Sequence, residues 1–175
     1  MKFVVISFVI AVTITGTDSR GLPGPSHVSA KTSFAVPVCR REALSIKEGE
    51  TDAAMGGVRQ TPYTLTNTSS SPCTLEGYPS VEVLNRQGKV VRRSKKQKVD
   101  EEIVSVTVEP GKTAWFSLNF NSGGAGYMGK PCQTYKVMKI TAPGADRAMV
   151  LRTSITSCSG STFEVSPVHA GSPNE

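Results

Sequence analysis

The stretch from Leu65 to Pro79, which reads L-T-N-T-S-S-S-P-C-T-L-E-G-Y-P, limits the possible folds more than any other part of the chain. Apolar and polar side chains alternate from Tyr63 into its first residues. A run of Thr and Ser after Asn67 breaks the alternation, and an apolar pattern resumes at Cys73. Alternation followed by a polar turn cluster is typical of a half-buried antiparallel strand and its reversal. The stretch therefore predicts a strand, a turn begun by Asn67, and a returning segment that a cysteine can tie to the sheet.

Similar alternating segments recur along the chain and are separated by turns rich in Gly and Pro. Short strands are predicted over residues 43–47, 58–67, 80–85, 89–92, 103–108, 113–120, 132–141, 149–155 and 163–168. No segment has a sustained helical period, so the predicted fold is all-β, an antiparallel β-sandwich of about eight strands. Five side chains on the apolar faces of their strands are expected to point between the sheets: Leu65, Val83, Val106, Phe116 and Leu118. The inward face of residues 132–141 is ambiguous, because Tyr135 and Met138 lie on opposite parities.

The chain has 175 residues, which fits one domain with tails. Residues 1–16 begin with Lys2 and continue as an apolar run that is short for a membrane span but suits a signal peptide. An uncleaved membrane anchor is the alternative. Residues 17–36 are rich in Gly, Pro and Ser and are expected to form a flexible linker. The domain is expected over residues 37–168, with a C-terminal tail over 169–175. The predicted location is extracytoplasmic, in a periplasm or outside the cell.

Four cysteines lie inside the predicted domain: Cys39, Cys73, Cys132 and Cys158. Behind a secretory segment, two disulfides are the expected state. Four cysteines allow three pairings, and the spacing alone does not choose among them. No two cysteines form a C-x-x-C pair, and both histidines, His27 and His169, are expected in the tails, so no metal site is predicted.

The chain offers no recognisable catalytic set. A hydrolytic triad needs a base beside its nucleophile, and neither histidine is placed for that role. Asp100, Glu101 and Glu102 follow a run of lysines and are interpreted as solvated counter-charges. The Gly-rich residues 121–126 have no following helix to complete a phosphate site. We therefore expect no catalytic residue, no cofactor and no enzymatic activity. Trp115 is expected to be packed in the core or beneath a neighbouring loop.

The segment from Arg86 to Lys98 is strongly basic. Seven of its thirteen residues are basic and none is acidic, so it exceeds the net charge of +6 for the whole chain. Dense like charges predict a segment that is extended, exposed and mobile beyond the short strand 89–92. It is either a solvated hairpin end, partly neutralised by Asp100, Glu101 and Glu102, or a contact with an anionic polymer, a membrane surface or nucleic acid. Sequence-specific nucleic-acid binding is not expected, because no aromatic side chain is interleaved. The candidate contact residues are Arg86, Lys89, Arg92, Arg93, Lys95, Lys96 and Lys98.

Taken together, these motifs resemble the secreted bacterial family known as domain of unknown function 4232. The resemblance is carried by the N-T-x-x-x-P-C-x-L-x-G-Y-P pattern within 65–79, V-E-P-G-K-T-A at 108–114, the four cysteines, and S-P-V at 166–168. It covers about residues 38–168. It implies an immunoglobulin-like sandwich with disulfides Cys39–Cys73 and Cys132–Cys158, and it supplies no catalytic residues. The charged stretch around residues 92–102 is longer and more basic than this pattern implies.

The expected function is that of a secreted, non-catalytic module of unknown molecular function that contacts a protein or the cell envelope. The alternative is a binder of an anionic polymer or membrane surface through residues 86–98. An enzyme with an unrecognised site ranks last. The partner is unknown, with an envelope protein or an anionic surface as the expected classes, and the protein is expected to be a monomer.

Overall fold

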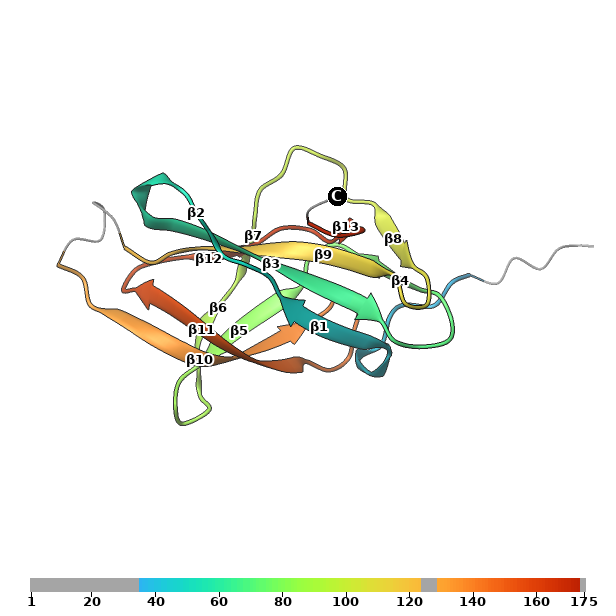
Figure 1. The fold of residues 1–175 in the computed structure, drawn as a ribbon, viewed down its shortest axis with the longest axis horizontal. Coiled ribbons are helices and arrows are strands. Elements are labelled where there is room, and N and C mark those ends of the chain that lie inside the picture. Colours follow the sequence, from blue (N-terminus) through green and yellow to red (C-terminus); the bar gives the residue numbers. More distant parts are fainter. Residues whose placement is uncertain (1–34, 124–128, 174–175) are drawn as a thin grey trace, which may run out of the picture. The chain divides into compact units, whose positions relative to one another are not determined.

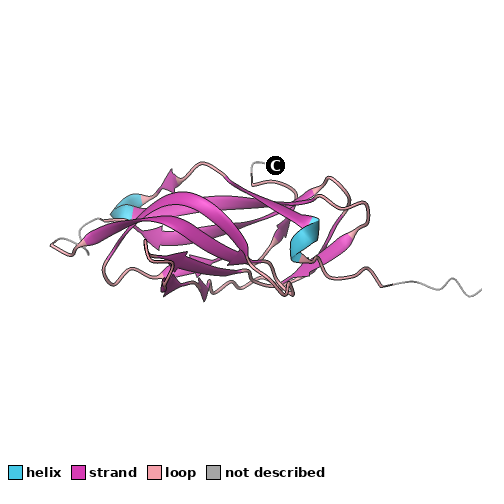
Figure 2. Ribbon diagram, turned by 90° about the horizontal axis from the view of Figure 1, so that it is seen from below, coloured by secondary structure: helices cyan, strands magenta, loops and turns pink. Residues whose placement is uncertain are grey.

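The computed structural model describes residues 35–123 and 129–173. The predicted signal segment, almost all of the linker and part of the Gly-rich loop lie outside the described residues. Two short 3-10 helices, η1 (Arg41–Ala43) and η2 (Met55–Gly57), lie at opposite ends of the sandwich (Figure 2). No helix in the described part of the chain is long and apolar enough to cross a bilayer. The remaining elements are strands: β1 (Leu44–Glu48), β2 (Asp52–Ala53), β3 (Val58–Asn67), β4 (Cys73–Glu76), β5 (Ser80–Leu84), β6 (Val90–Arg93), β7 (Lys95–Lys96), β8 (Ser105–Val108), β9 (Thr113–Asn121), β10 (Cys132–Thr141), β11 (Met149–Cys158), β12 (Phe163–Val165) and β13 (His169–Ala170).

The strands form two facing layers, as predicted for an all-β sandwich (Figure 1). A seven-stranded sheet has the order β1-β3-β9-β12-β7, with β2 added to β3 and β13 added to β9. A four-stranded sheet has the order β11-β10-β5-β6, and β4 and β8 form a separate pair. All of these strand pairs are antiparallel except β7 with β12, which run parallel.

The core lies between the two layers. The prediction of inward residues is confirmed, because Leu65, Val83, Val106, Phe116 and Leu118 are all buried. The ambiguous parity of β10 also has a structural cause. The register with β11 shifts between Tyr135 and Val137, and this β-bulge lets Tyr135 and Met138 both face the core. One extra residue therefore reconciles two patterns that a regular strand could not satisfy.

Each segment predicted as a strand overlaps a strand in the structure, and the bounds of β3 and β10 agree with the prediction. The segment predicted over 103–108 begins only at Ser105. The segment of β4 was predicted to return to the sheet but was not named as a strand, and β2, β7 and β13 were not predicted. These last three have two residues each, which is too short to show a period, and tertiary pairing determines them.

The C-terminal end of the domain differs from the expectation for His169. This residue was expected in a tail, but it lies in β13 opposite Trp115 of β9. The two rings are in contact, with centroids 4.8 Å apart. Trp115 is half-buried on the face of β9 opposite the buried Ala114 and Phe116. It therefore lies outside the core between the sheets, and its ring packs beside that of His169 in the adjacent strand.

Two disulfides close the fold, with the pairing that the family resemblance implies: Cys39–Cys73 and Cys132–Cys158. The first ties the segment before η1 to β4. The same two segments are also joined by a backbone hydrogen bond of 2.9 Å from the Cys39 N–H to the Thr74 carbonyl. The second joins the first residue of β10 to the last residue of β11. Loops of this size contribute about 3.5–4 kcal/mol each to stability on the chain-entropy model.

The turn that follows β3 is organised by the side chain of Asn67, which is fully buried. Its amide nitrogen donates to the Ser71 and Val108 carbonyls, both at 2.8 Å. Its Oδ1 accepts from the N–H and the hydroxyl of Ser69, at 2.9 and 2.7 Å. Asn67 thus ends the strand and fixes the turn, as interpreted from the sequence.

Candidate functional site

Basic side chains from three strands meet on the outer face of the four-stranded sheet. Successive side chains of a strand point to opposite faces. Because Val81 and Val83 are buried, Glu82 points outward. Its partners across the sheet are Arg93 in β6 and Lys139 in β10, and paired residues share a face. Arg93 Nε donates to Glu82 Oε1 at 3.0 Å.

Two further basic residues extend this face across β10 and β11. Val137, two residues before Lys139, pairs with Arg152, which is therefore on the outer face and is exposed. Lys136 lies at the bulge, and its Nζ donates to Ser154 Oγ at 2.8 Å. Since Ser154 lies two residues after Arg152, Lys136 also reaches the outer face.

The turn between β5 and β6 adds basic side chains at one end of the sheet. Asn85 Oδ1 accepts hydrogen bonds from the N–H groups of Gln87 and Lys89, at 3.0 and 2.9 Å, and Gly88 supplies the positive φ of 77°. Arg86 and Lys89 are exposed on this turn. Arg86 and Lys136 line one shallow cavity of about 150 Å³.

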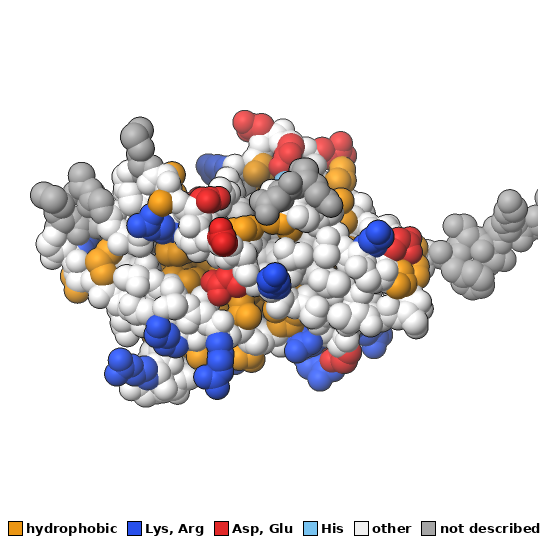
Figure 3. All heavy atoms as spheres, in the orientation of Figure 1, with side chains coloured by type: hydrophobic (Ala, Val, Ile, Leu, Met, Phe, Trp, Pro, Cys, Tyr) orange, Lys and Arg blue, Asp and Glu red, His pale blue; other side chains and the backbone are white. Residues whose placement is uncertain are grey.

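We call this set the basic face, and it consists of Arg86, Lys89, Arg93, Lys136, Lys139 and Arg152. Glu82 is the single acidic residue of β5, β6, β10, β11 and the turn 85–89, so the face carries a net charge of about +5 when six basic groups are set against it. In Figure 3, Lys and Arg side chains gather along the lower edge, where Figure 1 places this sheet and its turn.

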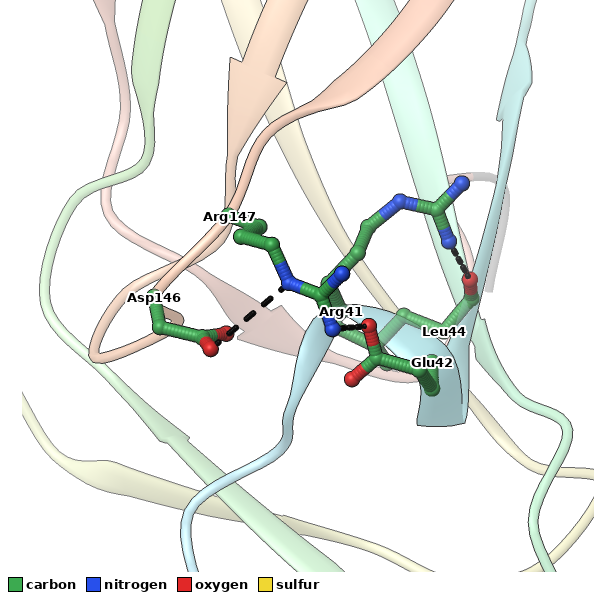
Figure 4. Close-up of polar contacts among 5 residues, drawn as sticks. All are labelled: Arg41, Glu42, Leu44, Asp146 and Arg147. Atoms are coloured by element: carbon green, nitrogen blue, oxygen red, sulfur yellow. Dashed lines mark hydrogen bonds and ion pairs between the residues drawn. The ribbon is translucent and has the colours of Figure 1, made fainter.

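Arg147 lies near the same sheet but does not belong to the basic face. It precedes β11, and its guanidinium contacts the carboxylate of Glu42 from η1 and lies 3.7 Å from that of Asp146 (Figure 4). Its charge is therefore compensated by two neighbouring carboxylates. The contact with Glu42 also joins η1 to the turn between β10 and β11.

The structure divides the basic segment predicted from the sequence between the two layers. Arg86, Lys89 and Arg93 lie on the basic face. Arg92 pairs with the inward-facing Val83 and is half-buried.

After Arg93 the chain crosses from the four-stranded to the seven-stranded sheet. Lys95 and Lys96 lie in this crossing, where β7 pairs with β12, and Lys98 follows it.

The segment beyond Arg92 is extended and exposed, but the expectation that it is mobile does not match its hydrogen bonding. The Ser94 N–H donates to the Val81 carbonyl at 2.8 Å, and the Gln97 N–H donates to the Val165 carbonyl at 2.8 Å. Lys96 Nζ lies 5.4 Å from the centre of the Tyr78 ring. These contacts fix the crossing between the layers despite its charge.

The predicted counter-charges do not neutralise this segment. Asp100, Glu101 and Glu102 are exposed, and in residues 35–123 and 129–173 they form no ion pair with it. Within those same ranges, no group of three or more His, Cys, Asp or Glu side chains is placed to hold a metal ion.

Sequence reasoning missed Lys136, Lys139 and Arg152, which contribute half of the basic face. They are isolated in the sequence, so no charge run indicated them. Their signal is parity, because Lys139 alternates with the buried Met138 and Ile140. The bulge at Tyr135 hides the same signal for Lys136.

A family model described as "Domain of unknown function (DUF4232)" matches residues 39–169, which is more than half of the chain. Comparison with curated proteins gives no match.

Proposed function

The chain belongs to this family of unknown function, and from that premise we propose that it is a secreted, non-catalytic binding module whose basic face holds an anionic polymer. The observation that carries the proposal is the gathering of six basic side chains from three strands and a turn around a single acid. A surface of one charge sign raises the local concentration of an oppositely charged ligand and speeds its association.

The shape of this face favours a polymer over a small molecule. The hollow lined by Arg86 and Lys136 measures about 150 Å³, which is below the usual range of about 300–1,000 Å³ for pockets that enclose a small ligand. The charges are instead distributed over β11, β10, β6 and the turn before β6, in a sheet whose adjacent strands lie about 4.8 Å apart. Such a row suits repeated anionic groups on an extended chain.

Three further parts of the proposal have separate support. Secretion is supported by two disulfides, which persist in oxidising compartments, and by the apolar segment at residues 1–16. The absence of catalysis is proposed because no nucleophile and base were recognised in the sequence. A bacterial, immunoglobulin-like protein is proposed from the family resemblance, and a monomer is proposed as a separate expectation. An experimental structure tests the immunoglobulin-like fold, and a measured solution mass tests the monomer.

The test compares two triple variants that remove the same charge from different sheets. Lys136→Ser/Lys139→Ser/Arg152→Ser removes half of the basic face, and the control Lys95→Ser/Lys96→Ser/Lys98→Ser removes three charges from the crossing and the seven-stranded sheet. Heparin is titrated as the anionic polymer at two salt concentrations. We expect the first variant to bind at least tenfold more weakly than the control, and wild-type affinity to fall steeply with salt, as it does when counterions are released.

Equal losses in the two variants would mean that only net charge matters and would contradict the assignment of the face. A parallel titration with vesicles containing anionic lipid identifies a membrane instead, if the vesicles bind and heparin does not. Replacing the face lysines by arginine keeps the charge, so a large loss of heparin binding in that variant would show that binding does not depend on charge alone and would contradict the proposal.

A further inference from the structure

The inward-facing side chains become polar at one end of the sandwich, where the start of β3 and the end of β9 face β11. Along β3 the inward positions run from Leu65 through Tyr63 and Thr61 to Arg59. Arg59 pairs with the buried Phe120 of β9, and Glu48 pairs with Tyr63. A cavity of about 390 Å³ lies here, and its lining includes Glu48, Thr51, Arg59, Phe120, Ser122 and Ile155. We call it the interlayer cavity.

Glu48 is fixed in this cavity by donors from both sheets. Its Oε1 accepts a hydrogen bond of 3.1 Å from the Tyr63 hydroxyl and one of 2.8 Å from the Thr153 hydroxyl. Burial, followed by the nearby Glu48 carboxylate, raises the pKa of Tyr63 well above its usual range, so the phenol stays a proton donor. The second oxygen, Oε2, accepts no hydrogen bond from the described residues.

Arg59 lines the same cavity with its terminal nitrogens unused. Its Nε donates to Ser122 Oγ at 2.9 Å, and among residues 35–123 and 129–173 the guanidinium has no other hydrogen bond and no ion pair. Arg59 lies four residues along β3 from Tyr63, the partner of Glu48, which is about 13 Å of strand. The Arg59 guanidinium and the Glu48 carboxylate are therefore too far apart to form an ion pair, and space remains between them.

A half-buried acid and a half-buried base that do not pair each lose hydration without full compensation. A ligand that accepts from Arg59 and donates to Glu48 would satisfy both. A purely anionic ligand would be repelled by Glu48, and a purely cationic one by Arg59. The Thr51 hydroxyl bonds that of Thr61 and the Ser122 hydroxyl accepts from Arg59, and each oxygen keeps room for a further hydrogen bond. Phe120 and Ile155 supply an apolar wall.

Hydroxyl groups that both donate and accept, carried on a compact ring with apolar C–H faces, meet these requirements. We propose that the interlayer cavity binds a neutral sugar residue, with Glu48 accepting and Arg59 donating hydrogen bonds to its hydroxyl groups. This site borders the basic face at Ser154, which lines the cavity and accepts a hydrogen bond from Lys136. Its proposed binding groups, Glu48 and Arg59, do not belong to that face.

The test is calorimetric titration of the protein with glucose, galactose, mannose and N-acetylglucosamine, with inorganic phosphate as an anion control. Glu48→Gln keeps an oxygen for the Tyr63 and Thr153 hydroxyls but replaces the free Oε2 by an amide donor. Arg59→Gln removes the guanidinium donors, and Arg59→Lys serves in its place if that variant fails to fold. Arg40→Gln, which changes an exposed charge just before η1 and outside both proposed sites, is the matched control.

We expect at least one sugar to bind saturably, Glu48→Gln and Arg59→Gln each to weaken that binding tenfold or more, and Arg40→Gln to leave it unchanged. Disaccharides of the binding sugar distinguish the source: equal or tighter binding indicates the end of a glycan, and weaker binding a free monosaccharide. The proposal is overturned if no sugar of the panel binds, if only phosphate binds, or if Glu48→Gln binds as tightly as the wild type.

Discussion

Replacement of Asn67 by alanine tests whether one buried side chain holds together the turn after β3 and the end of β8. The variant removes the buried hydrogen bond from the Asn67 amide to the Val108 carbonyl, which contributes about 0.5–1.5 kcal/mol because Val108 stays paired with Cys73 in the β4–β8 ladder. The bonds to Ser69 and Ser71 are partly open to solvent, so water compensates for part of their loss, and together they contribute about 0.5–1.5 kcal/mol. We expect a total destabilisation of about 1–3 kcal/mol.

Asn85 provides a matched control, because it also follows a strand and accepts two backbone N–H bonds, but in an exposed turn. We expect Asn85→Ala to cost less than about 1 kcal/mol. Asn67→Asp keeps the acceptor oxygen but sets a carboxylate against the Ser71 and Val108 carbonyls, so it is expected to destabilise at least as much as alanine. The free energies come from urea unfolding with the disulfides intact. Equal effects of Asn67→Ala and Asn85→Ala would refute this reasoning.

Three other measurements test the core, the buried phenol and the disulfides. Leu118→Ala removes a fully buried side chain and is expected to lower the free energy of unfolding by about 2–5 kcal/mol; a loss below about 0.5 kcal/mol would mean that Leu118 does not face the core. Because the pKa of Tyr63 is raised in the folded state, its contribution to stability is complete below about pH 10 and is lost as the pH rises above that value, so wild-type stability should fall more steeply there than that of Tyr63→Phe. Peptide mapping should find Cys39–Cys73 and Cys132–Cys158. Mild reductant should open Cys132–Cys158 first, because Cys132 is exposed whereas Cys39 and Cys73 are buried. Earlier opening of Cys39–Cys73 would contradict this.

The sequence was a reliable guide where strands are long. β3 alternates apolar and polar side chains from Tyr63 to Thr66, so its inward face follows from period two. β10 is equally long, yet its parity changes where its register with β11 shifts, and only the pairing of the two strands reveals that shift. Short strands such as β13 depend on partners distant in sequence, which explains why His169 was assigned to a tail.

The candidate site was only half predictable for a related reason. A run of charge is visible in sequence, but a charged face is built from residues that topology brings together. The chain crosses between the layers after Arg93. Three of the seven basic residues predicted as contacts therefore lie on the basic face, namely Arg86, Lys89 and Arg93. The interlayer cavity left no charge signal in the sequence, because Arg59 is the single charge of β3 and Glu48 stands beside the opposite charge of Lys47 in β1.

The most recognisable part of the sequence has a structural role rather than a ligand-binding one. Asn67 fixes the turn, Cys73 forms a disulfide, and Leu75 is fully buried. Gly77 adopts a φ of 97°, and the Tyr78 hydroxyl donates to the Gln97 carbonyl at 3.0 Å. Each of these residues is therefore required by backbone geometry, packing or hydrogen bonding.

The residues proposed to bind ligands lie elsewhere, on strand positions that can change without disturbing those contacts. Arg152 is exposed, and Arg59 donates a hydrogen bond to only one side chain of the described residues. A motif made of residues that the backbone needs identifies the fold, and fold alone does not determine function. Proteins that share the 65–79 pattern should therefore share this sandwich, while ligand binding should follow the outward residues of β10 and β11 and the polar residues of the interlayer cavity.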